Sequence, residues 1–138
     1  MFPQADIPVV ELSLDHAQSP AVHYQLGRSL QPLRQRGVLI VGSGNIVHNL
    51  GTMRWENIAY DWAVEFDAQV KDLIIAGDPT AIVNYEALSR SASLSLPTDE
   101  HFLPLLYVLA LQGKGEALHF FADKVTYGSL SMRSLRIG

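Results

Sequence analysis

The sequence has no cysteine among its 138 residues, few charged residues and no long uninterrupted apolar run. Without cysteine the chain forms no disulfide, offers no thiolate to a metal ion and has no thiol nucleophile. Its longest apolar runs are about a dozen residues, too short for a helix that spans a bilayer. Residues 1–6 lack the basic patch and apolar core of a secretion signal, so we expect a cytoplasmic protein that does not enter a membrane.

Positive charge is also scarce, with 10 basic residues against 14 acidic ones and a net charge of −4. No basic run is present, and nucleic acid is therefore not expected as a partner. Apolar residues make up 48% of the chain. Two interpretations fit this composition: residues 1–138 form one domain with a large core, or part of the apolar surface is covered by a partner or by further chain.

The first third of the chain has the pattern of a strand, a helix and a second strand. Residues 7–14 are rich in β-branched side chains, and residues 38–41 are continuously apolar, as in a buried parallel strand. Between them Ser19-Pro20 starts a helix that Gly37 ends, with apolar residues at helical spacing, namely Val22, Leu26, Leu30 and Leu33. These elements predict a right-handed βαβ unit in an α/β fold, with a mostly parallel or mixed sheet flanked by helices.

The rest of the chain alternates between helical and extended patterns. Apolar residues at helical spacing predict a helix over residues 58–73, closed by Gly77, and a shorter helix from Asp78-Pro79 through Leu88. Residues 89–97 are serine-rich and predict an exposed loop. Thr98 is expected to cap a buried helix over residues 102–111, and residues 118–121 and 129–137 to form strands.

A glycine turn follows the second predicted strand and leads to His48. In open α/β sheets ligands bind beyond the carboxyl ends of strands, so a histidine there is a candidate base or metal ligand. Gly42 and Gly44 also suggest a phosphate-binding loop. That alternative is weak, because the third glycine of the dinucleotide motif and the lysine of a P-loop are both missing.

Five histidines could carry chemistry. His16 and His23 are expected at the surface or its boundary, and His119 is expected to be structural. His48 follows the glycine turn, and His101 lies in the first turn of a predicted buried helix. We expect these two rings to open on one crevice, where Glu100 completes a half-site for a divalent metal.

Five segments of the chain have a recognisable pattern: GVLIVGSGNIVHNL, HFLPLLYVLAL, YGSLSMRSLRIG, FPQADIPVVELSLD and HYQLGRSLQPLRQRGV. Together they resemble the class III extradiol ring-cleavage dioxygenases, in particular the 4,5-DOPA-dioxygenase-like branch. The resemblance implies that the chain has the fold of the C-terminal half of that catalytic domain. It also implies that a missing N-terminal half carries further metal-binding histidines, so that the site is completed by that half or by another copy of the chain.

The resemblance assigns roles to individual residues. The family motif Gly-Asn-x-x-His matches Gly44, Asn45 and His48, and it implies that His48 faces the catechol as the acid/base or as a metal ligand. We expect Asn45, in this motif, and Asn49, which the glycine turn brings near the same place, to contact the substrate.

A second family motif, Glu-His-Phe-x-Pro, matches residues 100–104. It implies that His101 binds the metal, with Glu100 as the alternative, since a carboxylate fills this place in distant relatives. The metal would be non-haem Fe(II) or Zn(II).

These expectations amount to an extradiol dioxygenase that opens the ring of a catechol such as DOPA with dioxygen. The other hypothesis is a non-catalytic, truncated metal-binding or assembly module of the same fold. Stoichiometric metal that is lost on substitution of His48 or His101 would favour the enzyme, whereas a stable, metal-free oligomer would favour the module.

Overall fold

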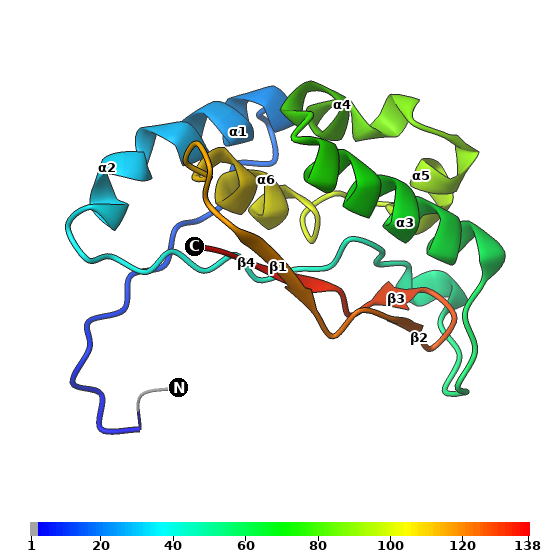
Figure 1. The fold of residues 1–138 in the computed structure, drawn as a ribbon. Helices are drawn as coiled ribbons and strands as arrows, with labels where there is room; N and C mark the ends of the chain where they lie inside the picture. The colour runs from blue at the N-terminus through cyan, green and yellow to red at the C-terminus, as the bar shows by residue number, and fades with distance from the viewer. Residues whose placement is uncertain (1–2) are drawn as a thin grey trace.

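The computed structural model describes residues 3–138; Met1 and Phe2, the first of the residues that lack the features of a secretion signal, lie outside the described residues. Figure 1 shows a layer of helices above two small sheets and two extended segments. In chain order the elements are α1 (Pro20–Ser29), α2 (Gln31–Arg34), η1 (Leu50–Thr52), α3 (Asp61–Ala76), α4 (Pro79–Val83), η2 (Tyr85–Ala87), α5 (Arg90–Ser95), α6 (Leu103–Ala110), β1 (Leu118–Phe121), β2 (Val125–Thr126), β3 (Leu130–Ser131) and β4 (Ser134–Ile137).

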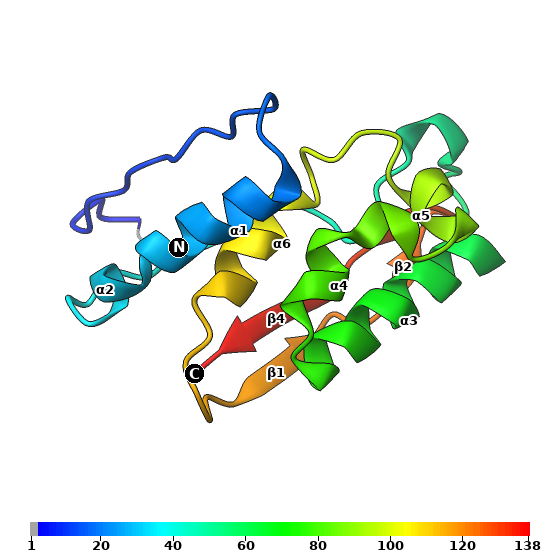
Figure 2. The same ribbon diagram turned by 90° about the horizontal axis from the view of Figure 1, so that it is seen from above.

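The helices form two groups around a common core. Helix α1 packs along α6, while α3 packs against α4 and α5, as Figure 2 shows from above. Helix α6 is apolar throughout and buries most of its side chains, including Leu103 and Leu106, which are both fully buried. Among residues 3–138 no helix is both long and apolar enough to cross a bilayer.

The long helix α3 follows the sequence prediction closely. Its inward face buries Phe66, Val70 and Ile74. It ends at Gly77, which adopts φ +67, a left-handed conformation that glycine reaches without a steric penalty. The predicted end of this helix is therefore confirmed.

Two predictions in the following segment are wrong. The serine-rich stretch expected as a loop contains α5. Thr98 does not cap a helix, because α6 begins only at Leu103 and the Thr98 hydroxyl donates to Glu100 Oε1 at 2.8 Å. Pro104 lies in the first turn of α6, where its missing N–H leaves no helical bond unmade.

The two sheets are small and each is antiparallel, which corrects the expected mostly parallel or mixed sheet. Strand β1 pairs with β4, and β2 pairs with β3. The described residues form parallel pairing at a single bridge, between Ala59 and Gly128. Helices and sheets together still give an α/β fold.

The predicted strands 7–14 and 38–41 are also wrong: both segments are extended, but neither pairs with a strand. They run along the lower side of the molecule in Figure 1. A parallel strand is stable only beside a neighbour that accepts its hydrogen bonds, and the described part of the chain offers none to these two segments. Their side chains are exposed as a result, with Val10 90% and Leu39 71% accessible.

Candidate active site around His48 and His101

His48 and His101 lie face to face, although they are 53 positions apart in the sequence. Their ring centroids are 3.7 Å apart and their planes differ by 24°. Both side chains are partly exposed. The expectation that the two rings meet is thus confirmed by the structure, while the roles assigned to them stay predictions.

The backbone around His48 is held by two neighbouring segments. The His48 N–H donates to the Ser95 carbonyl at 2.9 Å, and His48 forms an isolated antiparallel bridge with Leu130 of β3. On one side of His48, Ser131 N–H donates to the Val47 carbonyl at 3.0 Å. The turn after the extended segment therefore ends in an ordered bridge rather than in a free loop.

His101 is placed by the glycine turn itself. The Asn45 N–H donates to the His101 carbonyl at 2.8 Å. A Cβ atom on Gly44 would lie 2.0 Å from that carbonyl oxygen, so the approach of the two segments needs glycine at this position. The glycine turn thus joins the two histidine segments, a role that needs no phosphate.

Glu100 adds a carboxylate beside the rings, with its Oε1 3.8 Å from His101 Nε2. The hydrogen bond from Thr98 is the main cause that lowers the pKa of Glu100 below its usual value, and the charge of His101 adds to it. Burial lowers the pKa of His48, and the nearby His101 charge lowers it further. Near neutral pH the site therefore holds an anionic carboxylate and a neutral His48 ring.

The two asparagines have structural contacts of their own. The Asn45 side-chain amide donates to the Ser131 carbonyl and the Asn49 amide donates to the Leu94 carbonyl, both at 2.7 Å. Their amide nitrogens therefore hold the main chain around the histidines, and substrate contact by either residue stays a prediction.

The donors have the right chemistry for a non-haem metal but are too few. Imidazole and carboxylate are common ligands of iron and zinc. Within residues 3–138, however, no group of three or more histidine, aspartate, glutamate or cysteine side chains could hold an ion. The described residues therefore do not form a complete metal centre.

The other histidines lie outside this cluster. His23, expected near the surface, is fully buried between α1 and α6, where its Nδ1 and the Tyr107 hydroxyl are 2.9 Å apart. That expectation is wrong because the helix buries the face that carries His23 against α6. His16 lies in an exposed turn, as expected, and His119 is exposed on β1.

Sequence reasoning missed a buried polar cluster behind His48, formed by Asp67, Ser131 and Arg133. Asp67 is 3% exposed and Ser131 is 1% exposed. A carboxylate next to Phe66 on the buried face of α3 is the signal that could have pointed to it, because an aspartate is seldom buried without a partner.

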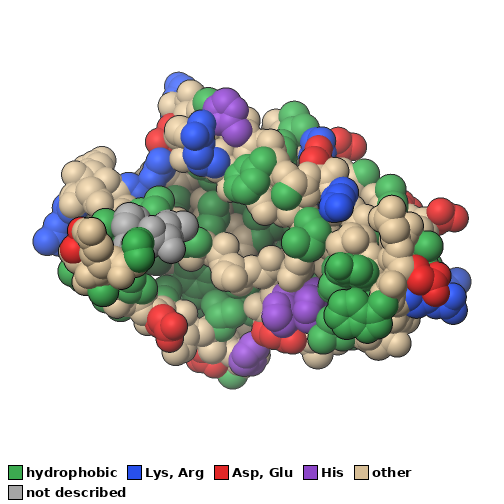
Figure 3. All heavy atoms as spheres, turned by 90° about the horizontal axis from the view of Figure 1, so that it is seen from below, with side chains coloured by type: hydrophobic (Ala, Val, Ile, Leu, Met, Phe, Trp, Pro, Cys, Tyr) green, Lys and Arg blue, Asp and Glu red, His purple; other side chains and the backbone are tan. Residues whose placement is uncertain are grey.

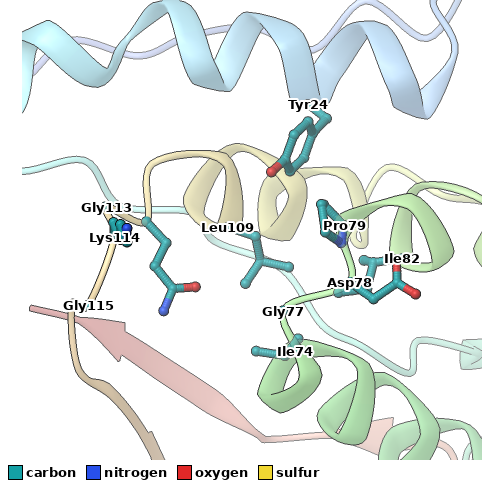
Figure 4. A pocket seen from close by; sticks show the side chains of 11 residues that line it. Tyr24, Ile74, Gly77, Asp78, Pro79, Ile82, Leu109, Gly113, Lys114 and Gly115 are labelled. Atoms are coloured by element: carbon teal, nitrogen blue, oxygen red, sulfur yellow. The ribbon is translucent and has the colours of Figure 1, made fainter.

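The molecular surface seen from below carries several histidine side chains. Figure 3 shows histidine side chains with acidic atoms and apolar side chains beside a hollow lined by hydrophobic groups. A separate cavity of about 340 Å³ lies between Tyr24, Ile82 and Lys114 (Figure 4). None of the five histidines lines it.

Comparison with known proteins shows the family to which the chain belongs. Residues 1–133 match the family described as the catalytic LigB subunit of aromatic ring-opening dioxygenase, and the chain belongs to this family. It is 42% identical over 143 residues to a 4,5-DOPA dioxygenase extradiol of Escherichia coli, covering 100% of this chain and 52% of the relative. It is 38% identical to the 4,5-DOPA dioxygenase extradiol of Mirabilis jalapa, covering 83% of this chain and 43% of the relative.

A solved structure has the same fold. The crystal structure of an uncharacterised protein from Escherichia coli K12 matches with a TM-score of 0.93 and 42% identity, covering 100% of this chain and 58% of that one. The chain therefore spans about half the length of the relatives it matches.

Proposed function

We propose that this chain supplies the part of an extradiol dioxygenase active site that carries His48 and His101, and that the substrate is a catechol such as DOPA. The stacked rings carry this proposal, because two segments far apart in sequence meet at their histidines in a member of a ring-opening dioxygenase family. The names of the relatives in Escherichia coli and Mirabilis jalapa favour an extradiol reaction on DOPA.

His48 would move the catechol proton. A neutral imidazole accepts a proton from a hydroxyl group at its unprotonated ring nitrogen and can return it later. The lowered pKa of His48 keeps this nitrogen free at neutral pH. Asn45 and Asn49 would contact the substrate through their side-chain oxygen atoms, since their amide nitrogens already donate to main-chain carbonyls.

His101 and Glu100 would contribute to the metal centre. Non-haem iron supplies the redox chemistry that activates dioxygen, which a d¹⁰ zinc ion does not. Because the described residues do not complete a ligand set, the remaining donors would come from a segment equivalent to the part of the relatives that this sequence does not cover. We therefore assign the chemistry to the completed assembly and not to this chain alone.

The missing segment would bind to the lower face, which is formed by the unpaired residues 7–14 and 38–41. Val9 and Val41 are 81% and 68% exposed, and the N–H groups of residues 39–44 donate to no main-chain carbonyl in the described part of the chain. Free N–H groups beside apolar side chains suit the addition of a strand. The occupant we propose is a polypeptide equivalent to the half of the relatives that this chain does not cover.

Complementation tests the proposal. The chain, the uncovered part of the Escherichia coli relative and their mixture are each loaded with ferrous iron and given L-DOPA, and oxygen uptake and the ring-opened product are followed. We expect turnover by the mixture only. In the mixture, His48→Ala should lower kcat by about 10²–10⁴-fold, whereas His119→Ala, on exposed β1, should leave it unchanged. Turnover by the chain alone at enzymatic rates would refute the half-site argument.

A second candidate is an assembly module that keeps the fold without catalysis, which the incomplete ligand set and the exposed apolar face favour. Metal analysis of the mixture separates the two. Iron bound in a 1:1 ratio and lost on His101→Ala supports the enzyme. A stable, metal-free complex supports the module.

A further inference from the structure

Ser131 is a buried junction at which every polar group has a partner. Its N–H donates to the Val47 carbonyl at 3.0 Å, and its carbonyl accepts from Asn45 Nδ2 at 2.7 Å. Its hydroxyl donates to Asp67 Oδ1 at 2.5 Å and accepts from the Arg133 N–H at 3.2 Å. A side chain that is 1% exposed and fully hydrogen-bonded has one available position.

The junction reaches both histidine segments. Through Val47 it holds the residue that precedes His48. Through Asn45 it reaches His101, because the N–H of the same asparagine donates to the His101 carbonyl. One serine thus connects to the two segments whose rings stack, although it contacts neither ring.

A buried ion pair fixes the other side of the junction. Asp67 Oδ2 accepts from Arg133 Nε at 3.0 Å and from Arg133 Nη2 at 2.5 Å, and the two side chains are 4% and 8% exposed. Arg133 also contacts Asp123, which pairs with Lys71 at 2.8 Å. Buried ion pairs are weak sources of stability compared with apolar packing, and in some proteins they instead select one conformation.

We propose that Asp67 and Ser131 are positioning residues that set the stacked arrangement of His48 and His101. Asp67, on the rigid helix α3, fixes the Ser131 hydroxyl and thereby β3, and β3 in turn fixes the two segments that carry the rings. The use of the rings in catalysis rests on the proposed function, but their arrangement does not.

Nuclear magnetic resonance of the histidine rings in the isolated chain tests this directly. Each stacked ring lies over the face of the other, so its protons are shifted upfield and a cross-ring nuclear Overhauser effect connects them. We expect Ser131→Ala, which removes only the hydroxyl, to move the ring protons downfield and to weaken that effect. Asp67→Asn, which keeps the shape and removes the charge, should act in the same direction.

Ser95 provides a matched control. Ser95 is also a fully buried serine beside His48, and its carbonyl accepts from the His48 N–H, but its hydroxyl has no hydrogen-bond partner among residues 3–138. Ser95→Ala should therefore leave the ring signals where they are. The proposal is overturned if Ser131→Ala leaves the ring signals unchanged, or if Ser95→Ala moves them as far.

Two further measurements distinguish an effect on folding from an effect on function. Circular dichroism verifies the fold of each variant, and if Asp67→Asn does not fold, Ser131→Ala decides alone. In the complemented mixture Ser131→Ala should lower iron affinity or kcat by about 10-fold or more, the usual effect of a residue that orients a ligand. Displaced rings in a mixture that never turns over would refute the proposed function and leave this inference standing.

Discussion

Residues 38–41 and helix α6 are both continuously apolar, yet the first segment lies exposed on the lower face and the second is buried in the core. A helix satisfies its backbone hydrogen bonds within its own segment, so it needs only an apolar surface to pack on. A strand needs a neighbour for its backbone as well as for its side chains. The difference shows that α6 is packed within the described residues, whereas residues 38–41 have no pairing strand among residues 3–138.

The largest difference between the two regions should appear in the free energy of unfolding. Phe102 is fully buried, with its ring 4.6 Å from that of Tyr85 and 6.2 Å from that of Phe66. Phe102→Ala should lower the free energy of unfolding by about 3–5 kcal/mol, measured by urea denaturation. Val10→Ala, on the exposed segment, should change it by less than about 0.5 kcal/mol. Equal losses of stability in the two variants would contradict the difference between the packed helical core and the exposed extended segments.

A smaller loss of stability is expected at Gly44, where the extended segment approaches the start of α6. Gly44→Ala would force the His101 carbonyl away and break its bond from Asn45, at a cost of about 1–3 kcal/mol in thermal or urea unfolding. Gly51→Ala is the control, because its Cβ would meet only the end of the Asn49 side chain, at 3.3 Å. If Gly44→Ala is no more harmful than the control, the close approach does not hold the segments together.

The change in stability with pH should be smaller than the loss expected for Gly44→Ala. The pKa of His48 is lowered in the folded chain from its ordinary value of 6.5, so below that pH the unfolded chain binds more protons. Stability should therefore fall as the pH decreases through 6.5 and below. His48→Gln should flatten this part of the profile, measured by urea denaturation at a series of pH values. A profile unchanged by His48→Gln would show that the lowered pKa does not contribute to stability.

The smallest effect on stability is expected at the lower face. Val41→Lys should change the free energy of unfolding of the chain by less than about 0.5 kcal/mol. The same change should abolish binding of the complementing polypeptide in isothermal titration calorimetry, because a lysine would be buried without a partner. Leu94→Lys, on exposed helix surface, is a control that should not affect binding. Normal binding by Val41→Lys would place the partner elsewhere.

The sequence predicts best those parts whose structure depends on nearby residues. The apolar spacing of α3, its end at Gly77 and the strand β1 are all found in the structure. Residues 7–14 were predicted as a strand from composition, but pairing depends on a partner that composition does not reveal. The serines at residues 89–97 predict a loop, yet Ala92 is buried and α5 packs on α3.

The sequence predicts those residues of the candidate site that lie in recognisable motifs. His48 and His101 were singled out from a glycine turn, a helix start and the resemblance of both motifs to one family, and the structure brings their rings together. The junction at Ser131 could not be foreseen, because it joins residues 45, 67 and 131 through folding alone. Periodicity detects which face is buried and does not say which polar groups meet there.

The valine-rich segments of the lower face have a practical consequence for anyone who produces this chain by itself. Extended backbone with unused amide groups and apolar side chains is the surface through which sheet proteins stick to one another, and no lysine interrupts residues 7–14 or 38–41. Overproduced alone, the chain should collect in inclusion bodies at high expression. Co-production with its complementing half should return it to the soluble fraction.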